Sequence, residues 1–372
     1  MRKIPVYEPS LGSEELNNVI DAVKSGWIGS AGGKYLSEFE EKFAKYHRMK
    51  HAIATSNGTA ALHVALKALG IGKGNEVIVP TLTFIATANA VIYCNAKPVF
   101  VDSHPEYYNM DPSKIEEVIT HKTKAIIPVH LYGHPCDMDW IIDIAEDHDL
   151  YVIEDAAQAH GAEYKGKKVG SFGDISCFSF YGNKTMTTGE GGMCLTNNEE
   201  IAEKIRLLIN HGKNPTKHFW HDVIGFNYRM TNLQAAVGVA QLNKLEEFIE
   251  KKRKIAKRYS EGLKELEEEE RIKLHPEMSW AKCIYWMYSI LVEDSFGMSR
   301  DELMKRLEGE GIDTRPFFYP IHKQPCYNIT GVFPNSEYIS ERGLSLPSST
   351  LLGEETIMYI SEKIKLFLQK EG

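Results

Sequence analysis

Residues 176–193, SCFSFYGNKTMTTGEGGM, place one lysine, Lys184, between two different patterns. Residues 177–180 alternate in the manner of a buried strand, and residues 185–192 are mostly glycine, threonine and glutamate, which is typical of a tight loop. A lysine fixed between a strand end and such a loop is a candidate for bonding to an aldehyde cofactor, because lysine forms Schiff bases. A solvated loop lysine is the alternative, and the segment alone does not decide between them.

Short apolar runs alternate with helix-like segments on both sides of this stretch. Residues 77–79, 126–129 and 151–153 are apolar throughout, which is typical of parallel strands covered on both faces. The alternation predicts an α/β domain with a mostly parallel sheet, and ligands bind beyond the carboxyl ends of such strands. Polar side chains collect at those expected ends: Asp102, His130, Glu154, Asp155, Ser179 and Lys184.

A turn of small residues at 56–59, SNGT, separates a strand-like run from an alanine- and leucine-rich helix. A helix start of this kind exposes backbone N–H groups and the positive end of the helix dipole, so it is a site for an anion, most naturally a phosphate. An ordinary helix cap is the alternative. Ser13 likewise is predicted to cap a helix, with Leu16, Val19, Ile20 and Val23 at helical spacing.

The rest of the chain divides into a few further regions. Residues 26–33 form a glycine-rich loop around Trp27, and residues 211–232 form a polar and aromatic loop long enough to suggest a function. Residues 233–259 read as one long helical region, whose basic cluster at 251–254 is predicted to lie on a solvated face. The composition then changes, which predicts a large α/β domain at 1–247 and a smaller C-terminal α+β domain at 248–372.

Composition excludes several classes of protein. The net charge of −8 over 372 residues argues against a nucleic-acid binder. Six scattered cysteines suggest neither a disulfide framework nor a zinc ribbon, and no second ligand cluster accompanies the residues of 130–137, so no metal is expected. No signal-like or membrane-spanning apolar run is present, and the expectation is a soluble, cytoplasmic enzyme of small-molecule metabolism.

Four parts occur in the chain order required by pyridoxal phosphate enzymes of the commonest architecture. They are a helix start for the phosphate, an aromatic residue to cover the ring, an acid for the ring nitrogen and a Schiff-base lysine. An acid paired to that nitrogen keeps it protonated, which makes the ring an electron sink. The corresponding residues are Asn57, Gly58 and Thr59, then Phe84, then Asp155 and then Lys184.

Eight segments together resemble the sugar aminotransferases of the DegT/DnrJ/EryC1/StrS group, which are fold type I pyridoxal phosphate proteins. They lie at 26–33, 55–66, 80–91, 129–138, 152–162, 171–193, 226–236 and 315–327, and cover essentially the whole chain. The resemblance implies that Lys184 binds the cofactor and moves a proton, that Asp155 pairs with the ring nitrogen, and that Phe84 stacks on the ring. It further implies contacts of Gln158 with the phenolic oxygen and of Gly58, Thr59 and Ser179 with the phosphate.

The resemblance also implies a shared site. Asn227 would reach the cofactor phosphate of the other subunit, which predicts a homodimer. The implied substrate contacts are Trp27, His160, Arg315 and His322. Some members carry histidine in place of the lysine and are dehydratases, whereas this chain keeps Lys184.

The implied reaction is amino transfer from L-glutamate to the 4-keto carbon of a nucleotide-linked 4-keto-6-deoxy sugar. The segments GNK and TTGEGGM favour GDP-4-keto-6-deoxymannose, and UDP- or dTDP-linked sugars stay open. A non-catalytic, cofactor-binding regulatory protein is the alternative class, although it would lose Lys184 or Asp155. An NAD-dependent enzyme would need a GxGxxG motif, which TSNGTAAL does not supply.

Overall fold

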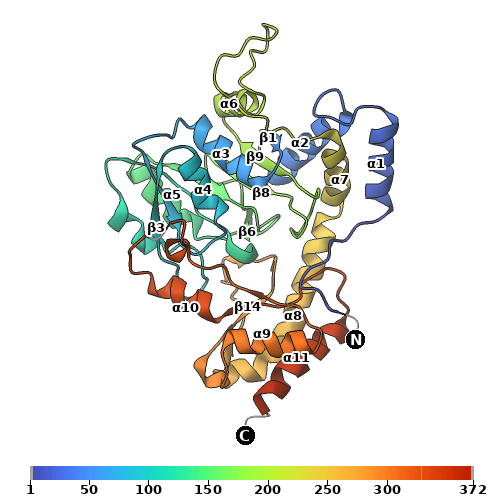
Figure 1. Cartoon of the computed structure of the whole chain (residues 1–372), viewed down its shortest axis with the longest axis vertical. Helices are drawn as coiled ribbons and strands as arrows, with labels where there is room; N and C mark the ends of the chain where they lie inside the picture. Colours follow the sequence, from blue (N-terminus) through green and yellow to red (C-terminus); the bar gives the residue numbers. More distant parts are fainter. Residues whose placement is uncertain (1–2, 328, 370–372) are drawn as a thin grey trace.

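A seven-stranded sheet forms the centre of the chain in the computed structural model, which describes residues 3–327 and 329–369 (Figure 1). Its strand order is β1-β9-β8-β5-β4-β2-β3. All its strands run parallel except β9, which is antiparallel to β8 and β1. The prediction of a mostly parallel α/β fold is confirmed. The strands are β1 (His51–Thr55), β2 (Glu76–Pro80), β3 (Lys97–Val101), β4 (Thr123–Ile126), β5 (Tyr151–Asp155), β8 (Ile175–Ser179) and β9 (Gly192–Thr196).

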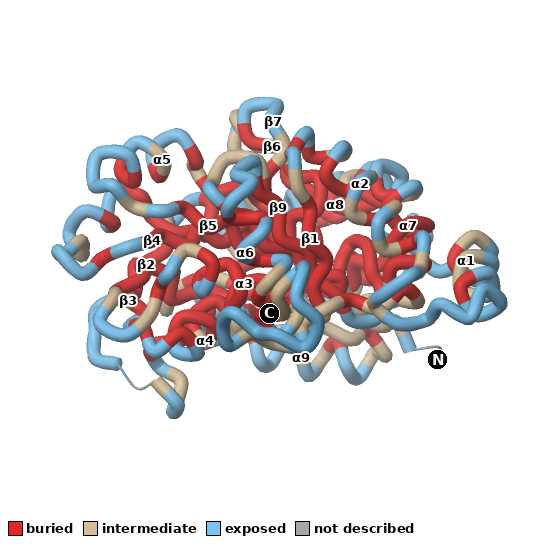
Figure 2. The backbone as a smooth tube through the Cα atoms, turned by 90° about the horizontal axis from the view of Figure 1, so that it is seen from above, coloured by how far each residue is buried: buried red, intermediate tan, exposed pale blue. Residues whose placement is uncertain are grey.

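Helices cover both faces of this sheet, which explains why its strands are apolar throughout. One face packs on α3 (Gly58–Ala68), α4 (Ala86–Tyr93) and α6 (Glu199–Ile209). The other packs on α2 (Lys34–His47), α5 (Met138–Asp147) and α7 (Asn232–Asn243). Cys177 and Phe178 are neighbours in β8 that enter the cores on opposite faces. The strands therefore lie in the buried interior (Figure 2).

The C-terminal part has its own core and a four-stranded antiparallel sheet of order β10-β12-β14-β13. A three-stranded sheet, β11-β6-β7, joins this part to the large one. The strands are β6 (Glu163–Tyr164), β7 (Lys167–Lys168), β10 (Ile272–Lys273), β11 (Ala281–Lys282), β12 (Ser289–Val292), β13 (Arg315–Pro316) and β14 (Gly343–Ser345). The helices are α8 (Leu245–Glu268), α9 (Arg300–Gly309), α10 (Pro334–Arg342) and α11 (Glu354–Gln369). Short 3-10 turns occupy Pro112–Lys114, Glu116–Val118, Leu131–Gly133, Asp294–Phe296 and Ile321–Lys323.

Helix α8 belongs to both parts. Its residues Leu245 and Ile249 enter the core of the large part, and Ile255 enters the C-terminal core. No break in secondary structure therefore marks the position 247, and the division there stays a prediction. The N-terminal lead also joins the C-terminal part, because Ile4 bridges Ile312 and the N–H of Ser348 donates to the Val6 carbonyl.

Two local expectations were wrong in detail. The N-cap of α1 (Ser13–Lys24) is Gly12, not Ser13, and the Glu15 carboxylate accepts a hydrogen bond from the Gly12 N–H at 2.8 Å. The region at 233–259 is helical as predicted, with a break at Lys244 between α7 and α8. The basic cluster at 251–254 is not wholly solvated, since Lys252 is buried with 1% of its surface exposed.

Helix α1 directs its apolar side outward. Leu16, Ile20 and Val23 are exposed, whereas its buried residues are Glu15 and Ala22. None of the described helices is both long and apolar enough to cross a lipid bilayer.

Candidate active site

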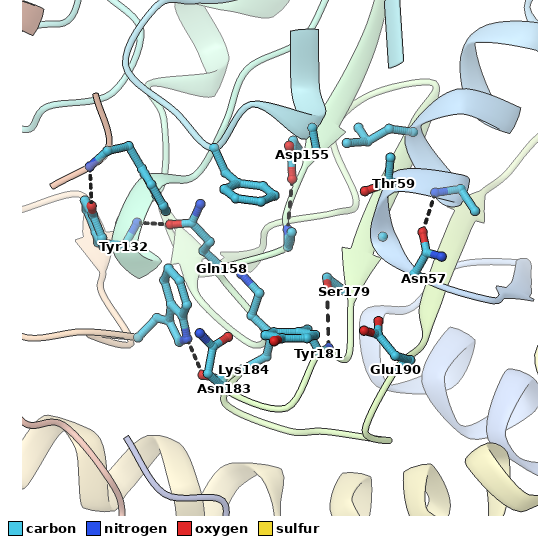
Figure 3. Close-up of a pocket in the computed structure, with 18 of the residues that line it drawn as sticks. Asn57, Thr59, Tyr132, Asp155, Gln158, Ser179, Tyr181, Asn183, Lys184 and Glu190 are labelled. Atoms are coloured by element: carbon cyan, nitrogen blue, oxygen red, sulfur yellow. Dashed lines mark hydrogen bonds between the residues drawn. The ribbon is translucent and has the colours of Figure 1, made fainter. Parts of the chain in front are cut away.

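A cavity of about 730 Å³ lies where the strands of the large sheet end and the C-terminal part faces them (Figure 3). The large part contributes strand ends and the start of α3, and the C-terminal part contributes Trp286, Arg315 and Phe318. The cavity brings together predicted site residues that lie far apart in the sequence. Those lining it are Gly58, Thr59, Phe84, Asp155, Gln158, Ser179, Lys184 and Arg315.

The start of α3 is built to hold an anion. The Asn57 side chain caps the helix by accepting a hydrogen bond from the Ala60 N–H at 2.8 Å. This cap leaves the N–H groups of Gly58 and Thr59, which no helical carbonyl reaches, for an anion in the cavity. Gly58 lies so close to Ser179 that an added Cβ would be 2.7 Å from the Ser179 Cβ. The close approach requires glycine here, and it brings the Ser179 side chain to the same end of the cavity.

Asp155 is the acid at the end of β5, and its carboxylate is buried. Thr87 donates its hydroxyl to one carboxylate oxygen at 2.8 Å, and the Ala157 N–H donates to the other at 3.2 Å. Burial raises the pKa of Asp155, and the hydrogen bond from Thr87 opposes that shift. A protonated ring nitrogen would supply this buried carboxylate with the charged donor that it lacks among the described residues.

Lys184 is buried at the centre of the site, which excludes a solvated loop lysine. Burial lowers the pKa of its amine to about 7, and the charge of Asp155 opposes that shift. The amine has no hydrogen-bond partner in residues 3–327 and 329–369, and it lies 3.8 Å from the centroid of the Trp286 ring. The lowered pKa increases the uncharged share of the amine, which is the form that a nucleophile requires.

Gln158 is oriented by the backbone. Its side-chain oxygen accepts a hydrogen bond from the Tyr132 N–H at 2.8 Å, so its NH₂ group remains to donate. Asp155, Gln158 and Lys184 converge on one space from three directions (Figure 3). Phe84 is 54% exposed and lines the same cavity, and its ring centroid lies 5.8 Å from that of Phe318. The donor set and the anion cradle fit pyridoxal phosphate.

Four predicted residues do not line the cavity. The His160 ring is buried against Phe178 and Phe180, neither of its nitrogens has a hydrogen-bond partner among the described residues, and burial lowers its pKa to about 3. His322 is buried between Thr81 and Glu337. Trp27 is exposed on its loop, and Asn227 is exposed beside Arg229. Of the predicted substrate residues, the structure brings Arg315 alone to the cavity of its own chain.

Sequence reasoning missed the aromatic wall opposite the sheet, which Tyr132, Trp286 and Phe318 form. No local pattern marks these residues, because the docking of the C-terminal part places two of them. Tyr132 and Phe318 lie in the segments at 129–138 and 315–327 that the resemblance includes, which is the signal that was available.

The second acid at the end of β5 has a structural role. Glu154 accepts hydrogen bonds from the N–H groups of Gly170, Phe172 and Gly173 at 2.6 to 2.8 Å and from His130 at 3.1 Å. The other His130 nitrogen accepts from the Cys136 N–H at 3.0 Å. Both nitrogens of His130 are thus taken by protein partners. In the part of the chain that the structure describes, no three His, Cys, Asp or Glu side chains are placed to hold a metal ion.

A buried lysine and a strand-end acid around an anion cradle, on a mostly parallel α/β sheet, are the arrangement expected of a pyridoxal phosphate enzyme. The family model described as the DegT/DnrJ/EryC1/StrS aminotransferase family matches residues 9–365, and the chain belongs to this family. The predictions of the family and of an aminotransferase are confirmed.

Named relatives match over nearly the whole chain. The GDP-perosamine synthase of Escherichia coli O157:H7 is 48% identical over 368 residues, which cover 99% of each chain. The solved structure of Streptomyces venezuelae DesV, described as a complex with a ketimine intermediate, is 34% identical with a TM-score of 0.93 and covers 99% of each chain. The PLP form of the sugar aminotransferase Spr1654 from Streptococcus pneumoniae is 28% identical with a TM-score of 0.92, and also covers 99% of each chain. The fold type I architecture is confirmed.

Proposed function

We propose that this chain transfers an amino group from L-glutamate to the 4-keto carbon of GDP-4-keto-6-deoxymannose and so produces GDP-perosamine. The observation that carries the chemistry is the buried amine of Lys184, with its pKa lowered to about 7, in one cavity with Asp155 and the start of α3. The choice of sugar nucleotide is supported by the 48% identity to the E. coli relative over nearly the whole chain. The expectation of pyridoxal phosphate is confirmed by the family and by the relative described in its PLP form.

The predicted cofactor residues of the cavity would each have a definite task. Pyridoxal phosphate, when bound, supplies an aldehyde that amines attack and a ring that withdraws electrons. Asp155 would hold a proton on the ring nitrogen, and the start of α3 with Ser179 would bind the phosphate. Gln158 would donate its NH₂ group to the phenolic oxygen, and Phe84 would cover the ring. The Lys184 amine would hold the cofactor and, once released, would carry a proton to and from the amino-bearing carbon.

Arg315 is the residue that we assign to the acidic groups of the substrates. It lines the cavity from β13, its side chain is exposed, and in the described residues it has no acidic partner. Glutamate carries carboxylates and the sugar nucleotide carries a diphosphate, so both substrates offer a group that a guanidinium can bind in bidentate geometry. We therefore expect substitutions of Arg315 to raise the KM for both substrates.

We further infer a homodimer with shared sites. The loop that precedes α7 stands away from the body of the chain (Figure 1) and exposes Phe219 and Ile224, with 82% and 91% of their surface accessible. Helix α1 adds a second apolar surface, and contiguous exposed apolar surface of this kind is typical of protein interfaces. Asn227 lies at the base of the loop and outside the cavity of its own chain, which supports its assignment to the cofactor of the partner subunit.

The test is a direct assay of both half-reactions. Purified protein with pyridoxal phosphate is expected to show a visible absorbance band that disappears on addition of glutamate. The glutamate-treated protein is then mixed with GDP-, UDP- and dTDP-linked 4-keto-6-deoxy sugars, and the GDP-linked sugar is expected to restore the band fastest.

Two results would contradict the proposal. A wild-type band that does not respond to glutamate would exclude an aminotransferase with this donor. A non-catalytic regulatory protein would give the same unresponsive band. Faster recovery with a UDP- or dTDP-linked sugar would reassign the acceptor. Sedimentation of the same sample, compared with an Ile224→Asp variant, tests the homodimer.

A further inference from the structure

A second lysine, Lys252, is as deeply buried as Lys184 but lies outside the cavity. It belongs to α8, and its ammonium donates hydrogen bonds to the Trp286 carbonyl at 2.9 Å and the Ser348 carbonyl at 2.8 Å. The Tyr7 ring lies 5.3 Å from the same nitrogen, and no acidic side chain of the described residues pairs with it. Burying the amine of a lysine beside only carbonyls and an aromatic ring costs free energy, because no acidic group among the described residues compensates its charge. The burial of Lys252 at this position therefore indicates a function that outweighs the cost.

Trp286 links Lys252 to the active site. Its backbone N–H donates to the Tyr132 carbonyl at 3.0 Å, and its indole N–H donates to the Asn183 carbonyl at 2.6 Å. The Trp286 carbonyl also accepts the hydrogen bond from Lys252, so three hydrogen bonds fix Trp286. Its ring is nearly buried and lines the cavity, with the Lys184 amine 3.8 Å from the ring centroid. This distance is within the range in which an aromatic face attracts a cation.

Tyr7 makes a second connection between Lys252 and Lys184. The Tyr7 hydroxyl donates a hydrogen bond to the Lys184 carbonyl, while the Tyr7 ring lies beside the Lys252 ammonium. Lys252 thus stands where α8, the N-terminal lead, Trp286 and Ser348 meet, directly behind the wall that the Lys184 amine contacts.

We propose that Lys252 is a positioning residue of the active site, which fixes Trp286 where its ring holds the free amine of Lys184. The inference rests on the proposed role of Lys184 as the cofactor-binding lysine. In that role the amine is alternately bound and released, and the Trp286 ring gives the released amine a defined position in the cavity. Lys252 contacts neither substrate nor cofactor and acts only through Trp286.

The experiment titrates Lys184 without turnover. Full-length, cofactor-free protein is labelled with trace acetic anhydride at a series of pH values, and the peptide that contains Lys184 is quantified by mass spectrometry. In the Lys252→Met variant the midpoint of labelling is expected to fall by about half a pH unit to one unit, a roughly three- to tenfold weaker binding of the proton, because a displaced ring no longer stabilises the ammonium. In a Trp286→Phe background the same substitution is expected to have little further effect.

Lys257, an exposed lysine of the same helix, supplies the matched control, and Lys257→Met is expected to leave the midpoint unchanged. An unchanged or raised midpoint in Lys252→Met would overturn the proposal, as would an equal shift in the Trp286→Phe background. Should Lys252→Met fail to fold, the Lys252→Gln variant is labelled with 5-fluorotryptophan and its fluorine NMR spectrum is recorded. The Trp286 resonance is identified as the one that Trp286→Phe removes. It is expected to move in Lys252→Gln, while the resonances of the other four tryptophans stay in place. A stationary resonance would refute the proposal.

The failure of this inference can be told from the failure of the proposed function. Loss of the cofactor absorbance band in Lys184→Ala tests the role of Lys184 itself. The labelling experiment tests the coupling of Lys252 to Lys184 whether or not the protein turns over substrate.

Discussion

Burial lowers the pKa of both buried lysines, yet their surroundings differ. Burial lowers the pKa of both Lys184 and Lys252 to about 7, and neither forms an ion pair within the described residues. Both amines lie near an aromatic ring, but Lys184 lines a cavity near Asp155 and its amine has no hydrogen-bond partner among the described residues, whereas Lys252 lies outside the cavity and its amine is bonded to two carbonyls. A lowered pKa therefore does not by itself mark a reactive amine. Access to a cavity and unused hydrogen-bonding capacity distinguish the amine that can react from the amine that holds structure in place.

The largest effect is expected for Lys184→Ala. Loss of the amine removes both the bond to the cofactor and the carrier of the proton, so kcat is expected to fall by about 10⁴-fold or more. Steady-state rates with glutamate and the sugar nucleotide measure the loss, and the absorbance band of the bound cofactor checks the bond. Residual activity within tenfold of the wild type would remove the distinction between the two lysines.

Asp155→Asn is expected to have the next largest effect. An amide cannot hold a proton on the ring nitrogen by charge, and the loss of one such electrostatic contact typically lowers kcat by about 10²- to 10³-fold. Single-turnover rates with glutamate measure it. Thr87→Val, which removes only a hydrogen bond to this carboxylate, is the milder companion variant, and a larger loss in Thr87→Val than in Asp155→Asn would contradict the assigned role.

Stability should separate the lysines in the reverse order. Lys252→Met leaves two buried carbonyls without their donor, which is expected to lower the free energy of unfolding by about 1–3 kcal/mol. Lys184→Met breaks no hydrogen bond of the amine within the described ranges and is expected to leave stability unchanged or higher. Urea denaturation of the cofactor-free proteins measures both values, and equal destabilisation would show that the two environments do not differ as described.

The last expected effect is a dependence of stability on pH. In the unfolded chain a lysine keeps its ordinary pKa of 10.5, and in the folded protein burial lowers the pKa of Lys184 and Lys252 to about 7. Between these values the unfolded state binds more protons, so stability rises with pH, by at most about 1.4 kcal/mol per pH unit for each lysine. The slope of the free energy of unfolding against pH, between pH 7.5 and about 9, is expected to decrease in Lys184→Met and in Lys252→Met. It is expected to decrease further in the variant that carries both substitutions. A slope that neither substitution reduces would mean that these lysines do not titrate as described.

The residues that the large α/β part contributes to the site could be predicted from the sequence, because their geometry follows from one rule. The strands β5 and β8 end at the same edge of a parallel sheet, so Asp155, Ser179 and Lys184 had to lie near one another, and the turn before α3 opens toward the same edge. Phe84 and Gln158 follow strand ends as well, and they also line the cavity.

The remainder depends on docking and on orientation, which local patterns do not carry. Trp286 lines the cavity, and Lys252 bonds to its carbonyl, only because the C-terminal part packs against the strand ends. Lys252 is buried although it lies in a cluster of basic residues of a kind that is usually solvated. His160 follows Gln158 by two residues, yet its ring enters the core between Phe178 and Phe180 while Gln158 lines the cavity. Helical spacing located α1 but could not tell which side of the helix faces the core.

The pairing of the first residues with the last third of the chain sets an order of assembly. Ile4 meets Ile312, Val6 meets Ser348, and Tyr7 bonds to the backbone of Lys184. The N-terminal lead therefore cannot find these partners until residues 312 and 348 have been synthesised. The support behind the reacting lysine depends on pairings between segments more than 300 residues apart and so forms late in folding.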